Sequence, residues 1–257
     1  MKGHFIKNGV SFLLNTKDET QIQGSKLEAV LTIGNEQEHE IKIEGLFVSL
    51  NTANFKAVYG KKENAFEQIQ IIKFENTSIK SHQEVKYDIE FILEENCLIT
   101  DKKQSHFLKY GNEENSDHLQ LTIIPHDIFI KISELIQNFH RFKLKEFRPH
   151  KVGKKTGVEF KYSPPASRDL ACVDSFLLVQ RLEQESLELE CTFNIRKLNL
   201  ALPHAPAELQ VKTMQLKLPQ KNLSLGKDRQ GVPMLNQDFI LKNLDEAISS
   251  IKMKGLA

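Results

Sequence analysis

The residues that could carry acid–base chemistry lie close together in two short stretches of the first half of the chain. Ser116, Asp117 and His118 are consecutive, and Ser105 and His106 precede them. Members of a catalytic triad normally converge from separate segments, and the sequence contains no Gly-x-Ser-x-Gly motif for a nucleophile elbow. We therefore interpret the consecutive residues as a polar turn leading into a strand, and we expect no catalytic residue.

Neither a metal site nor a disulfide framework is indicated by the sequence. The chain has nine histidines and three cysteines, and none of them follows His-x-His, His-Glu-x-x-His or Cys-x-x-Cys spacing. The odd cysteine count, made up of Cys97, Cys172 and Cys191, argues against paired disulfides. We interpret these cysteines as reduced thiols in the core of a cytoplasmic protein, and we expect no metal ligand.

One short segment resembles a phosphate-binding loop. Residues 153–156 read Gly-Lys-Lys-Thr, but the first glycine that such a loop requires would fall at position 148, where the chain has Arg148. No buried strand is predicted directly before it. We therefore expect no nucleotide site and no bound cofactor.

The most unusual local charge lies in residues 139–155, where seven Lys and Arg residues and one Glu give a net charge of +6. Clustered cations focus electrostatic potential even on a nearly neutral protein, so this segment could bind phosphates, an acidic membrane or an acidic partner. The alternative is a solvated connector, part of which is an edge strand protected by its lysines. The candidate partner- or anion-binding residues are Arg141, Lys143, Lys145, Arg148, Lys151, Lys154 and Lys155.

The overall composition is that of an ordinary globular protein. Of the 257 residues, 40% are hydrophobic and 27% are charged, which excludes long disordered or low-complexity regions. The 35 basic and 34 acidic residues leave a net charge of only +1, so no field of the whole chain favours nucleic acid. No apolar stretch approaches the ~20 residues of a membrane-spanning helix. We expect a cytoplasmic protein that does not bind nucleic acid.

Alternation of apolar and polar residues with period two dominates residues 9–124 and predicts a series of strands buried on one face. It is clearest over residues 27–33, 87–93 and 119–123. Residues 69–74 are also predicted to be a strand, because they are rich in isoleucine. The connections are polar, and no helical pattern separates these segments. Strands in this arrangement favour an antiparallel sandwich over repeated β-α-β units.

The period changes after Pro125, where apolar residues at helical spacing predict a helix over residues 128–139 with Asp127 as its N-cap. Alternation resumes in the second half, and residues 176–195 predict a hairpin with its turn at residues 183–186. A second helical stripe predicts a C-terminal helix, with Asn236 as its N-cap.

The predicted fold class is mainly β, with two tandem antiparallel β-sandwiches, a short helix at their junction and a C-terminal helix. The first sandwich is expected to span residues 1–124. A junction helix and a basic connector are expected over residues 125–156. The second sandwich, with the terminal helix, is expected over residues 157–257.

Several segments of the chain carry a family resemblance. Residues 23–34 (QGSKLEAVLTIG) resemble an early glycine turn and strand, and residues 121–126 (LTIIPH) and 142–146 (FKLKE) resemble the segments that flank a short central helix. Residues 158–164 (VEFKYSP) are similar to an aromatic strand that opens a second sandwich. Together these segments resemble the bacterial sporulation-control family of the arrestin-like superfamily.

The resemblance implies a regulatory or scaffolding protein without catalysis, so it supplies no catalytic residue. It implies that the chain acts by binding other proteins, and we expect the contacts to use exposed sheet edges and loops. The alternative function is a binder of phosphate or of an anionic membrane surface, through residues 141–155. The sequence leaves open the identity of the partners and the oligomeric state, a homodimer included.

Overall fold

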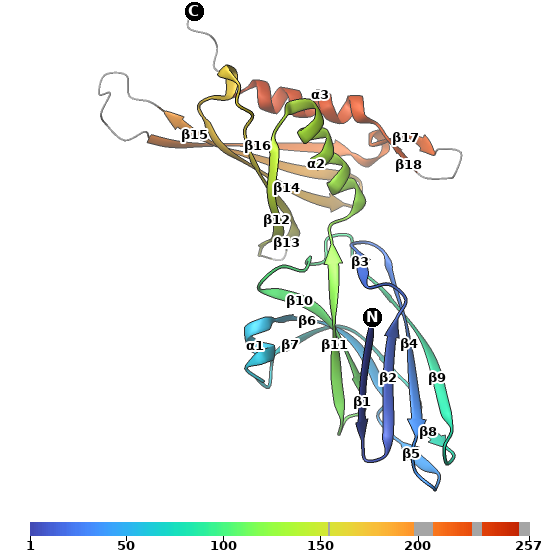
Figure 1. Cartoon of the computed structure of the whole chain (residues 1–257). Helices are drawn as coiled ribbons and strands as arrows, with labels where there is room; N and C mark the ends of the chain where they lie inside the picture. The colour runs from blue at the N-terminus through green and yellow to red at the C-terminus, as the bar shows by residue number, and fades with distance from the viewer. Residues whose placement is uncertain (154, 198–207, 228–232, 252–257) are drawn as a thin grey trace, which may run out of the picture. The chain divides into compact units, whose positions relative to one another are not determined.

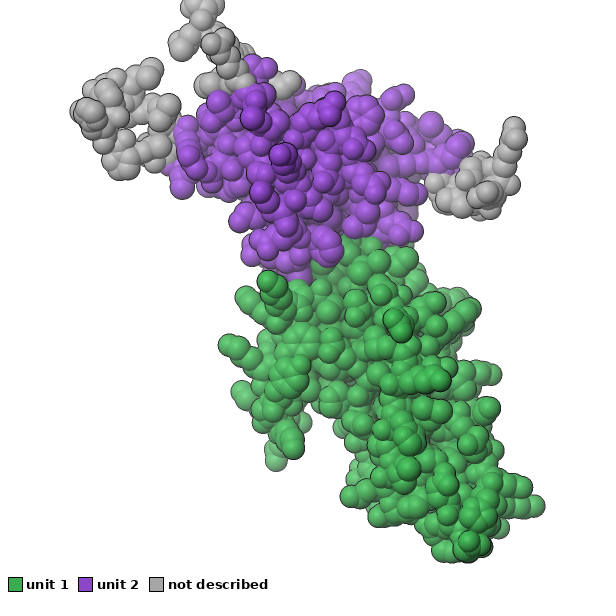
Figure 2. Space-filling model, in the orientation of Figure 1, with its two compact units in different colours: residues 1–125 green, residues 126–257 purple. Residues whose placement is uncertain are grey.

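The computed structural model describes residues 1–153, 155–197, 208–227 and 233–251. The chain divides into two compact units, Met1–Pro125 and His126–Ala257 (Figure 2). Both units are dominated by strands, which confirms the prediction of a mainly β protein. Among the described helices, none combines the length and the apolar character needed to cross a bilayer.

The first unit contains a four-stranded sheet and a five-stranded sheet (Figure 1). Every strand pair in them is antiparallel except β3 with β11, which run parallel. The four-stranded sheet has the order β1 (Lys2–Lys7), β2 (Val10–Thr16), β4 (Lys26–Asn35), β9 (Glu84–Ile92). The five-stranded sheet has the order β3 (Thr20–Ile22), β11 (Ser116–Ile124), β10 (Gln104–Gly111), β6 (Phe47–Asn54), β7 (Phe66–Lys73). The remaining elements are α1 (Phe55–Tyr59) and the pair β5 (Ile41–Ile43) and β8 (Thr77–Ile79).

The core of the first unit lies between its two sheets and follows from the alternation in sequence. On β4, Leu27, Leu31 and Ile33 are fully buried, whereas Glu28 between them is exposed. On β11, Leu121 and the other apolar residues at alternate positions are buried in the same way. Burial of one face of each sheet is the arrangement expected of an antiparallel sandwich.

The second unit is built on one five-stranded antiparallel sheet. In the described part of the chain, helices α2 and α3 form most of the layer that packs on this sheet (Figure 1). The sheet order is β12 (Lys143–Val152), β13 (Lys155–Ser163), β14 (Val173–Glu183), β15 (Ser186–Lys197), β16 (Glu208–Pro219). The other elements are α2 (Asp127–His140), α3 (Gln237–Ser249), the strand pair β17 (Ser224–Lys227) and β18 (Pro233–Leu235), and two 3₁₀ turns, Arg168–Leu170 and Gln220–Asn222.

Two buried hydrogen bonds tie α2 to the sheet. The Tyr162 hydroxyl on β13 donates to Ser133 Oγ at 2.8 Å, and Gln180 Nε2 on β14 donates to the carbonyl oxygen of Phe129 at 3.1 Å. Next to them, stacked aromatic rings fill the space above the sheet, with the ring centroids of Phe176 and a phenylalanine of β15 4.6 Å apart. A buried polar group is costly unless it is hydrogen-bonded, so these pairs fix where the helix sits.

Residues 143–152 lie in the segment that we expected to be a connector with an edge strand as part of it, and they form the edge strand β12. The reason is that apolar residues recur along this segment despite its charge. The ring of Phe147 packs 5.8 Å from the ring of Phe160 on β13, and Phe142, directly before the strand, is buried. The long lysine and arginine side chains extend into solvent while the strand backbone completes the sheet.

The prediction that Asp127 caps α2 is wrong. The cap is His126, whose Nδ1 accepts a hydrogen bond from the backbone N–H of Ile128, while Asp127 lies in the first turn. Its carboxylate is still favourably placed there, because the N-terminal end of a helix attracts negative charge. The predicted cap of α3 is confirmed, since Asn236 Oδ1 accepts from the backbone N–H of Phe239.

Candidate interaction surfaces

Six of the seven cations predicted as a binding site fall in the described part of the chain. They do not lie on one element. Arg141 directly follows α2 and has a left-handed backbone conformation, whereas Lys155 is the first residue of β13. The residues on β12 are Lys143, Lys145, Arg148 and Lys151, and Lys154 lies outside the described residues.

The cations of β12 lie on both faces of the sheet, as its pairing with β13 shows. Arg148 lies opposite Glu159 on one face, whereas Lys151 lies opposite Thr156 on the other. A β-bulge at Lys145 separates the pair Leu144–Tyr162 from the pair Glu146–Lys161. The bulge shifts the alternation of side chains between the two faces. The cations of this segment therefore do not form a patch on a single face.

Two of the cations are also engaged by acids. Arg148 Nε and Nη2 each lie 2.8 Å from Oε1 of Glu159, whose side chain is only 8% exposed. Lys155 Nζ lies 3.8 Å from a carboxylate oxygen of Glu183 and 3.8 Å from one of Glu188. A close pair between an arginine and a buried carboxylate ties neighbouring strands together. Anion binding by the remaining lysines of β12 stays a prediction.

The acid–base candidates of the first half lie on β10 and β11 and take part in packing. Ser105 Oγ donates to the carbonyl oxygen of Leu121 at 2.6 Å, and His106 is buried, which lowers its pKa to about 4. The His118 ring lies 5.2 Å from the ring of Phe66. Ser116, Asp117 and His118 belong to β11 itself rather than to a turn before it. His118 Nδ1 lies 3.6 Å from Oδ1 of Asp117, and the backbone N–H of His118 donates to the same oxygen at 2.8 Å. In the described part of the chain, no group of three or more His, Cys, Asp or Glu side chains is arranged to hold a metal ion.

The three cysteines are free thiols. Burial raises the pKa of Cys97 and of Cys191 to about 12. Since the thiolate is the reactive form, a thiol with a raised pKa is a weak nucleophile at neutral pH. Cys191 is buried in the core as predicted, whereas Cys97 and Cys172 are only half-buried, so the prediction of core thiols holds for Cys191 alone.

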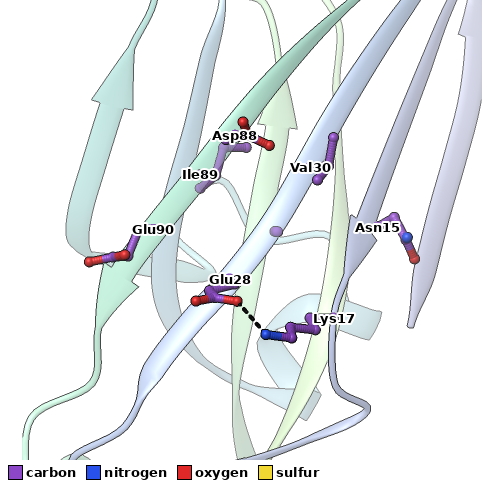
Figure 3. A pocket seen from close by; sticks show the side chains of 8 residues that line it. Asn15, Lys17, Glu28, Val30, Asp88, Ile89 and Glu90 are labelled. Carbon is purple, nitrogen blue, oxygen red and sulfur yellow. Dashed lines mark hydrogen bonds and ion pairs between the residues drawn. The ribbon is translucent and has the colours of Figure 1, made fainter.

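A shallow depression of about 520 Å³ lies on the outer face of β2, β4 and β9 (Figure 3). Glu28, Asp88 and Glu90 line it, and Lys17 Nζ lies 2.9 Å from a carboxylate oxygen of Glu28. The hydrogen bond from this lysine lowers the pKa of Glu28. Lys26 forms a second pair, 2.8 Å from Glu90. Because lysines neutralise two of the three acids, the depression has little net charge.

The free edge of the five-stranded sheet in the first unit has a different character. β7 pairs with β6 on one side and forms the edge of the sheet on the other. Residues 68–72 (QIQII) carry no charge, and Ile69 and Ile71 are 40% and 39% exposed. A bulge interrupts the pairing at Ile69, whereas residues 70–73 pair regularly with β6. The sequence predicted a strand here from its isoleucines, but it did not indicate that the strand lies at an edge.

Exposed edges of natural sheets are normally protected by charges, prolines or bulges. β12 follows this rule with four cations and Pro149, and β9 follows it with charged residues at alternate positions. β7 has charged residues only near its ends, Glu67 and Lys73, and its bulge affects only one half. Residues 70–72 are both uncharged and regularly paired with β6, and the Gln70 side chain donates to the carbonyl oxygen of Ile92 at the end of β9 at 2.8 Å. Among the described residues, no strand pairs with this short stretch on its other side.

The two consecutive units are both rich in strands, so the architecture is mainly β. Among solved structures, the chain is similar to Spo0M, a sporulation control protein from Bacillus subtilis, with a TM-score of 0.64 and 13% sequence identity. This match covers 95% of the present chain and 100% of the Spo0M chain. The chain therefore has a Spo0M-like fold.

Other matches are much weaker. A β-glucosidase from Listeria innocua has a TM-score of 0.30 at 15% identity, over 48% of this chain and 17% of that chain. Red sea bream transglutaminase also has a TM-score of 0.30, at 7% identity, over 83% of this chain and 27% of that chain. Neither likeness carries an argument about function. No protein-family model and no curated protein sequence matches the chain.

Proposed function

We propose that this protein is a non-enzymatic regulatory protein of the sporulation-control type, which acts in the cytoplasm by binding other proteins. The observation that carries the proposal is the uncharged, exposed edge of β7, with Ile69 and Ile71. A regulatory role is supported by the Spo0M-like fold, since Spo0M is a sporulation control protein. A cytoplasmic location is supported by the three free cysteines, which a reducing compartment keeps unpaired.

The partner is expected to add an extended strand to β7. In this mode of binding, backbone hydrogen bonds provide affinity, and alternate side chains provide specificity. Residues 70–73 offer the regular backbone for pairing, while the two exposed isoleucines offer apolar contact. Burial of a large aliphatic side chain contributes about 1.5–3 kcal/mol when it is complete, so their remaining exposed area provides part of that energy.

The test is a comparative pull-down from lysate of the source organism, quantified by mass spectrometry. The bait is the full chain as wild type, as the double variant Ile69→Lys/Ile71→Lys, and as the control Tyr59→Lys. Lysines on an edge strand disfavour strand addition, whereas Tyr59, 78% exposed on α1, lies outside the strands.

We expect a protein that is enriched by the wild type and by the control but is lost with the double variant. Circular dichroism and urea unfolding must show that all three baits are folded. Equal capture by all three baits would contradict binding through β7, and an enzymatic activity of the purified chain would contradict the non-enzymatic role.

A further inference from the structure

A groove in the second unit lies between α2, the first turn of α3 and the β17–β18 pair, and it has a volume of about 690 Å³. We call it the α2–α3 groove. Its apolar lining includes Phe139, Leu225 and Met234, and its charged lining consists of Lys131, Glu134 and Asp238. It belongs to a different unit from the β7 edge, so the two surfaces can be tested separately.

Three of the apolar side chains that line the groove are strongly exposed. Phe139 follows the buried Leu135 by one turn of α2 and is 59% exposed, and Leu225 and Met234 are 67% and 45% exposed. Phenylalanine and methionine are enriched in the cores of protein interfaces, and methionine adapts its shape to a partner. Exposed apolar residues gathered in a concave site mark a binding surface rather than random surface variation.

Two walls of the groove are helices, which determines what kind of chain can fill it. The backbone groups of α2 and α3 are largely bonded within the helices, and Asn236 caps the start of α3. An inserted segment finds few backbone partners on those walls, so it must satisfy its own N–H and C=O groups. A helix does this while it projects apolar side chains at positions i, i+3, i+4 and i+7.

The charges around the groove indicate which charged residues the bound helix carries beside its apolar stripe. A second depression of about 550 Å³ runs along α3, shares Asp238 with the groove, and adds Asp245, Glu246 and Lys242. Together with Glu134 and Lys131, the described lining of the two depressions has four acids and two lysines. His140 Nε2 lies 3.7 Å from Asp245. A partner with cations beside its apolar stripe complements this net negative charge.

We propose that the α2–α3 groove binds an amphipathic helix of a partner protein that carries Leu or Phe on one face and Lys or Arg beside it. Phe139 and Met234 contact its apolar stripe, and Asp238 and Glu134 attract its flanking cations.

The probe for the test is a fluorescein-labelled helical peptide of leucine and lysine, with leucine at i, i+3, i+4 and i+7. One control peptide has glutamate in place of lysine, and a second has the same composition in scrambled order. Binding to the full chain is measured by fluorescence anisotropy at two salt concentrations. The protein variants are Phe139→Ser/Met234→Ser and Asp238→Asn, and the matched control is Leu209→Ser on β16, which is 63% exposed.

We expect the lysine peptide to bind the wild type and the control equally, and to bind the Phe139→Ser/Met234→Ser variant about tenfold more weakly, which corresponds to about 1.4 kcal/mol. Asp238→Asn should weaken binding less than Phe139→Ser/Met234→Ser does, and it should make the affinity for the lysine peptide less dependent on salt concentration. Unchanged affinity in both groove variants would overturn the proposal, as would equal binding of the glutamate or scrambled peptide. Self-association of the wild type in light scattering that is lost with Phe139→Ser would also overturn it, because the occupant would then be a second copy.

Discussion

His106 should make the stability of the first unit depend on pH below neutrality. The side chain lies on β10 and is only 1% exposed, opposite Thr52 and Leu121 on the neighbouring strands. Its Nε2 has no hydrogen-bond partner in the described structure. Burial lowers its pKa from 6.5 to about 4, because the charged imidazolium is poorly solvated there.

The sign of the effect follows from the difference between the folded and unfolded pKa values. The unfolded chain binds a proton on His106 at a pH where the folded protein does not, so stability falls as the pH drops below about 6.5. Each unit of pKa difference corresponds to about 1.4 kcal/mol, so the full difference is about 3 kcal/mol. Between pH 7 and pH 5 the expected loss from this residue is about 2 kcal/mol.

The variant His106→Leu removes the titrating group and suits an apolar site. Urea unfolding is followed by circular dichroism at pH 7 and pH 5, since the chain has no tryptophan to report by fluorescence. The wild type should lose about 2 kcal/mol more than the variant between these pH values. The exposed His39, changed to Leu, controls for the substitution itself. Equal losses in wild type and His106→Leu would refute the reasoning.

Three further substitutions, all in the second unit, have predicted costs. A methyl group on Gly157 would lie 2.6 Å from Arg181 Cγ and 2.6 Å from a backbone oxygen, so Gly157→Ala should lower the free energy of unfolding by about 1–3 kcal/mol. Gly153 has a φ of 60°, but among the described residues no atom lies within 4 Å of an added methyl group, so Gly153→Ala should cost only about 1 kcal/mol. If urea unfolding showed a larger loss for Gly153→Ala than for Gly157→Ala, packing would not be the cause. Tyr162→Phe removes the buried bond to Ser133 and should cost about 1–2 kcal/mol, whereas an unchanged urea midpoint would mean that this bond does not fix α2.

Where one face of an element is buried and the other is solvated, the sequence predicted the element correctly. Alternation on β4 and the helical stripe of α2 are of this kind, and the predicted hairpin over residues 176–195 corresponds to β14 and β15. In each case the apolar residues recur with the period of the backbone that buries them.

β10 was missed because both of its faces are covered. Ser105, His106, Phe107 and Leu108 are all buried, so no alternation with polar residues is visible. The outward-facing ring of Phe107 lies under side chains that come from elsewhere in the sheet, with the ring of Phe66 on β7 5.4 Å away. Such contacts between distant segments cannot be recognised from local periodicity.

Prediction of the interaction surfaces requires the strand order and register even more than prediction of β10 does. The basic segment was recognised as a charge cluster, but the pairing of Arg148 with Glu159 follows from the register of β12 with β13. In the same way, residues 69–74 were recognised as a strand, but the exposure of Ile69 and Ile71 follows from the place of β7 at the end of the sheet. Neither the register nor the strand order is contained in a local pattern of residues.

The most direct test of the proposed function is hydrogen exchange of the full chain, alone and in complex with the partner identified by the pull-down. If a partner strand pairs with β7, amides of residues 70–73 on the free edge should exchange more slowly in the complex, while those of edge strand β12 should not change. Protection confined to other segments, with β7 exchanging at the same rate in both samples, would contradict the account.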